Sequence, residues 1–185
     1  MKRDISDNDL KNLLEEKYLK YNTTHFIDSD PVQIPHRFKE KNDIEISAFL
    51  TSIISWGNRK MIINNADKMM NIMGGSPYDF VINASEKNIK SVSFVHRTFN
   101  SDDFKFFILS LKNIYQNHGG LENVFITNQG DEWIFETITK FKKIFFSIDH
   151  MKRTTKHISD PAKRSACKRI NMFLRWMVRK DTSGV

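Results

Sequence analysis

The apolar residues of this chain recur mainly at steps of three and four, which is the spacing of one face of an α-helix. Residues that suit helix ends bound several of these stretches: Ser6 or Asp7 precedes one, Asn100 or Ser101 precedes another, and Gly57 follows a third. No alternation of apolar and polar residues typical of a strand or hairpin interrupts the series. The sequence therefore predicts an all-α fold, a compact multi-helix domain with roughly seven to nine helices.

The expected helices follow from these start and stop signals. Pro31 and Pro35 indicate an irregular segment between the first two helices, because proline removes a backbone donor and disfavours helix in the residue before it. In order, we expect helices over 7–21, from Asp43 to about Trp56, 58–73, a short one from Ser76-Pro77, 101–117, a short segment at 121–125, 131–148, and 159–179.

Length and composition indicate one globular domain over residues 1–185. With 39% hydrophobic and 28% charged residues, the chain has enough apolar mass for a core. No window approaches the ~20 apolar residues of a membrane span, and the charged N-terminus is unlike a signal peptide. The single Cys167 cannot form an internal disulfide, which favours a reducing compartment and a packed side chain. We therefore expect a cytoplasmic protein that does not enter a membrane.

Positive charge is concentrated near the end of the sequence. Residues 151–180 hold 10 Lys/Arg and one acid, which leaves 19 basic and 21 acidic residues in the rest of the chain. The whole net charge of +7 is thus generated in one segment. This imbalance predicts an anionic partner, with DNA or another polyanion the first candidate.

The expected helix 159–179 divides into two faces. Its apolar face should pack on the body and holds Ala162, Ala166, Ile170, Phe173, Leu174 and Met177. Its basic face holds Asn171 and four candidate nucleic-acid-binding cations, Arg164, Lys168, Arg175 and Arg179. Cations in this arrangement can reach neighbouring phosphates with salt-sensitive affinity. The alternative is a solvated basic face without a ligand.

Two short segments are further candidates. In the first, Asn58, Arg59 and Lys60 follow Trp56 and place two cations and free backbone donors at a helix start, which is a workable phosphate site; the alternative is a simple helix connection. The second, Phe94–Phe99, places His96 and Arg97 between aromatic residues, where a functional and a structural role are equally well supported.

Several chemistries have no support in the sequence. The six histidines show no paired spacing, so we predict no metal site, and the absence of a P-loop and of a dinucleotide fingerprint predicts no cofactor. No nucleophilic catalytic signature occurs, and the catalytic residues of any activity stay unassigned. Four candidate carboxylates cluster before the central helix, at Asp28, Asp30, Asp43 and Glu45, yet Asp28 and Asp43 serve equally well as turn and cap residues.

A set of motifs spread along nearly the whole chain resembles an uncharacterised bacterial family, typical of Bacteroidetes-like organisms and known as a domain of unknown function. The motifs are SDPVQIPHRF, DIEISAFLTSIISWGNRK, SPYDF, FVHRTFN, NIYQNHGGLE and SACKRINMFLRWMVRKD. Members of that family continue with an Asp-rich, Trp-containing segment and a Pro-Leu-Asp-x-His element. The resemblance therefore implies that this chain is truncated at its C-terminus.

The family is in turn distantly similar to helix-hairpin-helix DNA glycosylases. Residues 43–70 resemble their early helix pair, and residues 159–179 resemble their hairpin and following helix. Pro161 matches the hairpin's Pro-Gly-x-Gly core, but Ala162 and Arg164 replace its glycines, and Ala166 stands at the place of the lyase lysine. The resemblance implies DNA binding without a complete catalytic site, because the catalytic aspartate would lie in the absent part. We expect no release of a damaged base by this chain.

Two other hypotheses remain open at this stage. In one, the chain is a protein-interaction or complex-forming protein that associates with itself or a partner through Phe173, Trp176 and Met177, at the truncated end. In the other, it is an enzyme that uses His96 and Arg97 with the acidic turn at Asp28 and Asp30.

Overall fold

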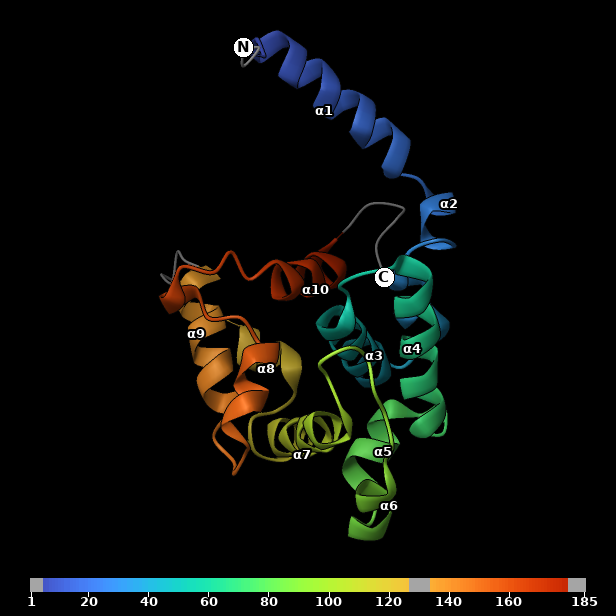
Figure 1. Cartoon of the computed structure of the whole chain (residues 1–185), viewed down its shortest axis with the longest axis vertical. Coiled ribbons are helices and arrows are strands. Elements are labelled where there is room, and N and C mark those ends of the chain that lie inside the picture. Colours follow the sequence, from blue (N-terminus) through green and yellow to red (C-terminus); the bar gives the residue numbers. More distant parts are fainter. Residues whose placement is uncertain (1–4, 127–133, 180–185) are drawn as a thin grey trace.

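The computed structural model describes residues 5–126 and 134–179, and within these ranges all regular secondary structure is helical. The predicted all-α class is confirmed. Ten α-helices occur in the described part (Figure 1): α1 Asp7–Tyr21, α2 Thr24–Ile27, α3 Lys41–Ile54, α4 Arg59–Ile72, α5 Pro77–Asn83, α6 Glu86–Ser91, α7 Ser101–Asn117, α8 Leu121–Phe125, α9 Ile134–Phe145 and α10 Lys168–Val178. Four short 3-10 helices accompany them: η1 Pro31–Gln33, η2 Pro35–Arg37, η3 Lys152–His157 and η4 Pro161–Lys163.

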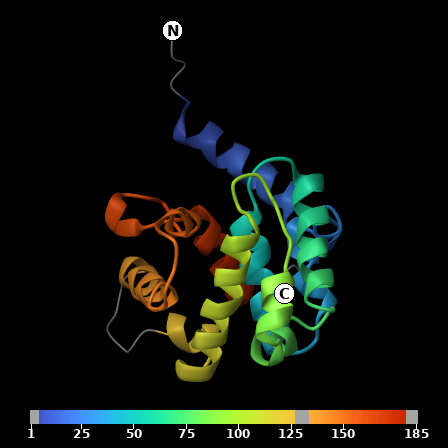
Figure 2. The same cartoon turned by 60° about the horizontal axis from the view of Figure 1, so that its bottom comes forward.

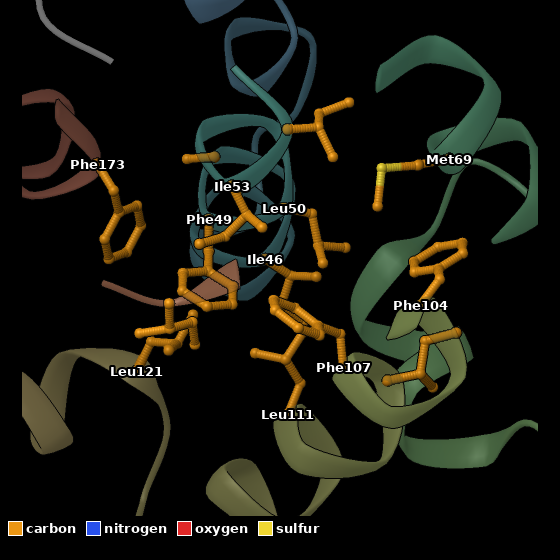
Figure 3. Packing of buried hydrophobic residues seen from close by; sticks show 14 of the residues in the cluster. Ile46, Phe49, Leu50, Ile53, Met69, Phe104, Phe107, Leu111, Leu121 and Phe173 are labelled. Atoms are coloured by element: carbon orange, nitrogen blue, oxygen red, sulfur yellow. The ribbon is translucent and has the colours of Figure 1, made fainter. Parts of the chain in front are cut away.

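Helix α3 lies at the centre of the fold. Every residue from Glu45 to Ile54 is buried, as the apolar content of this stretch predicts. Figure 3 shows Phe49 between Phe173 of α10 and the side chains of α7. The Phe49 ring lies 5.6 Å from the Phe173 ring and 6.1 Å from the Phe107 ring, centroid to centroid. Aromatic packing around α3 therefore joins the middle of the chain to its last helix.

Helix α7 forms the second wall of the core. Its N-terminus has a capping box, in which the Asn100 side chain accepts from the Asp103 amide and the Asp103 carboxylate accepts from the Asn100 amide. Phe107 of α7 packs against Phe145 of α9, with 4.8 Å between the ring centroids. The expected helix 101–117 is confirmed at both ends.

Other boundaries differ from the expectation. The short helices α2 and α6 were not expected, and α3 begins at Lys41 rather than Asp43. Of the expected helix 131–148, residues 131–133 lie outside the described residues, and α9 ends at Phe145.

The expected helix 159–179 is also wrong in its first half. Asp160 caps the 3-10 helix η4 through the Ala162 amide, and the backbone then turns twice through left-handed conformations, at Arg164 (φ 59°) and Cys167 (φ 46°). Only after these turns does α10 begin, at Lys168. Left-handed residues cannot continue a right-handed helix, so η4 and α10 are separate elements.

Helix α1 has the predicted bounds and the predicted cap, since Ser6 accepts a hydrogen bond from the Asp9 amide. None of its residues is buried. Figures 1 and 2 show α1 extending away from the remaining helices, to which α2 connects it. The apolar positions that predict this helix therefore stay exposed.

Candidate nucleic-acid interface

The turn between α3 and α4 depends on Gly57 and Asn58. Gly57 has φ +103°, a conformation that favours glycine, and it lies three residues after Ile54, the last residue of α3. The Asn58 side chain then accepts a hydrogen bond from the Met61 amide at 3.1 Å. Asn58 is thus the N-cap of α4, as its sequence context predicts, and its side-chain oxygen is already bonded.

A second turn, from His96 to Phe99, lies against the first. An antiparallel bridge joins His96 to Phe99, and Arg97 at the tip has φ 55°. The Arg97 guanidinium reaches back over Gly57: a Cβ atom added there would lie 2.7 Å from Nη1 of Arg97. The fold therefore brings together two segments that the sequence singled out separately.

His96 lies beneath this turn and supports Trp56. Its side chain is 1% exposed, its Nδ1 atom lies 2.9 Å from Nδ2 of Asn65, and its ring meets the Trp56 ring edge-on at 4.9 Å. Burial lowers the pKa of His96 below its ordinary value, so the imidazole is neutral at pH 7. These contacts match the structural alternative for His96.

Arg169, in the first turn of α10, contacts the other side of this region. Its guanidinium carbon lies 4.8 Å from the centroid of the Trp56 ring. It also donates to the backbone oxygen of Ile53 and, at 3.0 Å, to the backbone oxygen of His157. Sequence reasoning missed this residue, because nothing in the local pattern separates Arg169 from the neighbouring bases.

Behind Arg169, a buried network holds η3 against the start of α7. The fully buried Asp103 carboxylate accepts from Thr154 at 2.7 Å, from Arg153 at 3.0 Å and from Nε2 of His157 at 3.1 Å. Burial raises the pKa of Asp103, but hydrogen bonds from Asn100 and Thr154 and the nearby cationic groups outweigh it, so the pKa lies below its usual range.

Within this network His157 is the neutral partner. Burial lowers the pKa of His157 more than the Asp103 charge raises it. Arg153 and the hydrogen bond from Thr154 already compensate much of the Asp103 charge, which weakens its attraction for a proton on His157. Neutral His157 can still donate its Nε2 hydrogen to the carboxylate.

The cations predicted on one face of a continuous helix occupy three different places. Lys168 and Arg175 lie with Asn171 on an exposed face of α10, as predicted. Arg164 is exposed in the left-handed turn between η4 and α10. Arg179 follows the end of α10 and donates to the Asn22 side chain.

The predicted apolar face of the same segment is confirmed only within α10. Ile170 and Phe173 are 1% and 2% exposed, and Met177 and Leu174 are partly buried. Ala162 and Ala166 are exposed, contrary to the prediction, because they precede the helix.

The first turn of α10 has free backbone donors. No side chain caps the helix at Cys167, and the Lys168, Arg169 and Ile170 amides have no acceptor among the residues that the structure describes. Amides at a helix start, together with the helix dipole, attract anions. This helix start lies beside the exposed Lys168 and the turn at Arg164.

Arg59 and Lys60 begin α4 on the other side of Trp56. The Arg59 guanidinium lies over the Phe26 ring at 5.4 Å and 4.0 Å from the Asp30 carboxylate, and its side chain stays 54% exposed. Asp30 itself caps η1 by accepting a hydrogen bond from the Val32 amide. Lys60 is exposed.

Over residues 5–126 and 134–179, no three His, Cys, Asp or Glu side chains are placed to share a metal ion. In the same part of the chain, no helix combines the length and the apolar character needed to cross a membrane. Cys167 is 2% exposed, and burial raises its pKa, so the expected packed thiol is confirmed.

Comparison with known proteins gives one match. A family model described as a protein of unknown function, DUF2400, matches residues 30–185. No curated protein and no solved structure matches the chain.

Proposed function

The chain belongs to the DUF2400 family of proteins of unknown function, and we propose that it binds nucleic acid, with DNA the first candidate. The proposed surface, here called the basic surface, consists of Arg164, Lys168, Asn171, Arg175 and Arg179 around α10, with Asn58, Arg59 and Lys60 at the start of α4. Trp56 and Arg97 lie between the two parts. Arg164, Lys168 and Arg175 are exposed, and they lie around a helix start whose first amides have no acceptor among the described residues. Exposed cations beside backbone amides are how proteins bind phosphates.

The observation that carries the proposal is the start of α10. Three amides without acceptors in the described part of the chain point out of a helix whose first residue is an exposed lysine. An exposed arginine, Arg164, stands four residues earlier in a left-handed turn. One phosphate at this point would receive backbone hydrogen bonds and two cations, so its binding would depend strongly on salt.

Two basic residues of the segment 151–180 make internal contacts and are not part of the proposed basic surface. Of the ten bases in residues 151–180, Arg153 is bonded to Asp103, and Arg169 is bonded to backbone carbonyls and stacked on Trp56. Both therefore have a structural role. The basic surface is smaller than the charge of the sequence indicates, and Arg169 joins its α10 part to α3 through the Ile53 backbone oxygen.

We further propose that the segment 160–178 acts as a hairpin followed by a helix, as in helix-hairpin-helix DNA glycosylases. Support comes from the backbone at Arg164, which adopts φ 59° where the glycosylase pattern has a glycine. The left-handed backbone of the hairpin is thus kept although Arg164 replaces a glycine. The arginine side chain, unlike glycine, limits how closely the DNA backbone can approach the hairpin.

The hypothesis of an open protein interface at Phe173 and Trp176 is wrong for these two residues. They are 2% and 8% exposed and belong to the core. Neither residue is available to a partner. An interface elsewhere on the chain is not affected by this result.

The test is fluorescence anisotropy of a labelled 20-base-pair duplex and of its single strands, titrated with the whole chain. We expect the variant Lys168→Glu/Arg175→Glu to bind at least tenfold more weakly than the wild-type chain. The matched control is Lys87→Glu/Lys90→Glu in α6, which makes the same change in net charge at the far end of the fold (Figure 1). Equal losses in both variants would mean that net charge alone, and not this surface, attracts the ligand.

A further inference from the structure

Helix α1 carries an uncovered apolar stripe. Leu10, Leu13, Leu14 and Tyr18 follow helical spacing and are 45%, 43%, 60% and 56% exposed. A shallow groove runs between Leu10, Leu14 and Tyr18 along one side of the stripe. Four large apolar side chains on one helix face form a surface that water solvates poorly.

The helix itself also needs a packing partner. It has 15 residues, and isolated helices of about this length are marginally stable in water. In proteins, most helical stability comes from the packing of an apolar face rather than from propensity. Figure 1 shows α1 extending away from the other labelled helices, and none of its residues is buried.

The charges of α1 restrict what can cover the stripe. Four acids, Asp7, Asp9, Glu15 and Glu16, oppose three lysines, Lys11, Lys17 and Lys20, so the helix is close to neutral. Membrane-surface helices and polyanion-binding helices need an excess of Lys or Arg on the polar face. Two acids, Asp7 and Asp9, lie in the first turn, and Lys20 lies in the last turn. Opposite charges at the two ends of a helix are complementary to those of an antiparallel copy.

We propose that α1 pairs antiparallel with α1 of a second copy of this chain, about a two-fold axis at Leu14. Leu14 is the midpoint between Asp7 and Tyr21, so it would meet Leu14 of the second copy, and Leu10 would lie opposite Tyr18 of the second copy. The pair is isologous, since both copies use the same stripe.

Two charged residues beside the apolar stripe also favour the antiparallel orientation. Asp9 and Lys20 are eleven residues apart, which is about three helical turns, so both lie on one flank. In the antiparallel pair, Asp9 comes within one residue of Lys20 of the second copy along the axis, and the reverse contact repeats by symmetry. Antiparallel helix dipoles also attract each other.

The interface is small. Each helix is about 22 Å long at 1.5 Å per residue, and two such helices bury less surface than the ~1,200 Å² of a standard stable interface. We therefore expect a reversible dimer whose population rises with protein concentration. Its formation does not involve the basic surface, so it is independent of the proposed function.

Analytical ultracentrifugation of the whole chain over a hundredfold concentration range tests the dimer. We expect the wild-type chain to associate, and Leu10→Glu/Leu14→Glu to sediment as a monomer throughout. The control is Leu19→Glu, because Leu19 is 70% exposed and lies nine residues, half a turn out of phase, from Leu10. A monomeric wild-type chain would show that something other than a second copy covers the stripe. Unchanged association of the double variant would place the interface elsewhere.

Disulfide crosslinking tests the orientation. Leu14→Cys should form a dimer under mild oxidation, whereas Leu10→Cys should not, because equivalent Leu10 positions lie about 12 Å apart along the axis in an antiparallel pair. A mixture of Leu10→Cys and Tyr18→Cys chains should crosslink. The native Cys167 is 2% exposed and does not interfere. Efficient crosslinking of Leu10→Cys with itself would indicate a parallel pair and overturn the proposal.

Discussion

The guanidinium of Arg169 lies over the Trp56 ring, 4.8 Å from its centroid, and joins the start of α10 to the end of α3. The same guanidinium donates to the backbone oxygens of Ile53 and His157, which belong to segments about a hundred residues apart in the sequence. Burial lowers the pKa of Arg169, yet an arginine keeps its charge at pH 7. Arg169 is therefore a structural cation within a basic segment.

Replacing Arg169 should destabilise the fold. Arg169→Ala removes the contact with Trp56 and leaves two backbone oxygens without their donor, which should lower the free energy of unfolding by about 2–4 kcal/mol. The neighbouring Lys168→Ala should change it by less than about 0.5 kcal/mol, because Lys168 is exposed. Urea denaturation at pH 7 measures both. Similar losses in the two variants would argue against the role of Arg169.

Replacing Gly57 should lower the stability of the fold for two reasons that can be measured separately. Gly57→Ala places a Cβ 2.7 Å from Nη1 of Arg97 and forces a side chain into φ +103°, so we expect a loss of about 1–3 kcal/mol. In the background Arg97→Ala, the steric part should vanish while the backbone strain remains. A double-mutant cycle followed by thermal melting measures how much stability Gly57→Ala loses in the wild-type and in the Arg97→Ala background. Equal losses in both backgrounds would mean that Arg97 does not lie on Gly57.

The buried histidines make stability depend on pH. Burial lowers the pKa of both His157 and His96 in the folded chain, below the ordinary value of 6.5 that they keep when unfolded. As the pH falls below about 6.5, the unfolded chain takes up these protons first, so stability decreases. It is fully retained above that pH.

His157→Gln provides the matching variant, because a glutamine amide can still donate to Asp103. We expect it to lose less stability than the wild-type chain between pH 7.5 and pH 5.5, whereas replacement of the exposed His118 by Gln should leave the wild-type pH dependence unchanged. Chemical denaturation at the two pH values gives the comparison. A wild-type pH dependence in His157→Gln would contradict the assignment.

The centre of the core should be sensitive to truncation. Phe49 is fully buried and its ring meets those of Phe107, Phe141, Phe145 and Phe173. Phe49→Ala should therefore cost about 3–5 kcal/mol, while Leu109→Ala, at a side chain that is 43% exposed, should cost far less. Guanidinium titration followed by tryptophan fluorescence gives both values. A small effect at Phe49 would mean that the aromatic cluster is loosely packed.

Much of the fold could be predicted because its signals are local. The Asn100 cap, the Asn58 cap and the burial of α3 each follow from residues within a few positions of one another. The short helices α2 and α6 were missed because four and six residues give too little periodicity. The start of α10 was missed because Arg164 and Cys167 adopt left-handed conformations, which arginine and cysteine rarely adopt and which their residue types therefore do not predict.

The candidate site was harder to predict than the fold. Its exposed cations were found by composition, but the contact of Arg97 with Gly57 spans forty residues of sequence and the bond of Arg153 to Asp103 spans fifty. Such pairs are set by tertiary packing, which a single sequence does not display. The structural roles of Arg153 and Arg169 could therefore be found only from the structure.

The most direct test of nucleic-acid binding is the salt dependence of duplex affinity. Each phosphate contact contributes about −0.9 to the slope of log affinity against log salt concentration. Anisotropy titrations from 50 to 300 mM KCl should give a steep slope for the wild-type chain, and Lys168→Glu/Arg175→Glu should flatten it by about 2. The Lys87→Glu/Lys90→Glu control should keep the wild-type slope. A wild-type slope in the α10 variant, or no duplex binding by the wild-type chain at 50 mM KCl, would contradict the account.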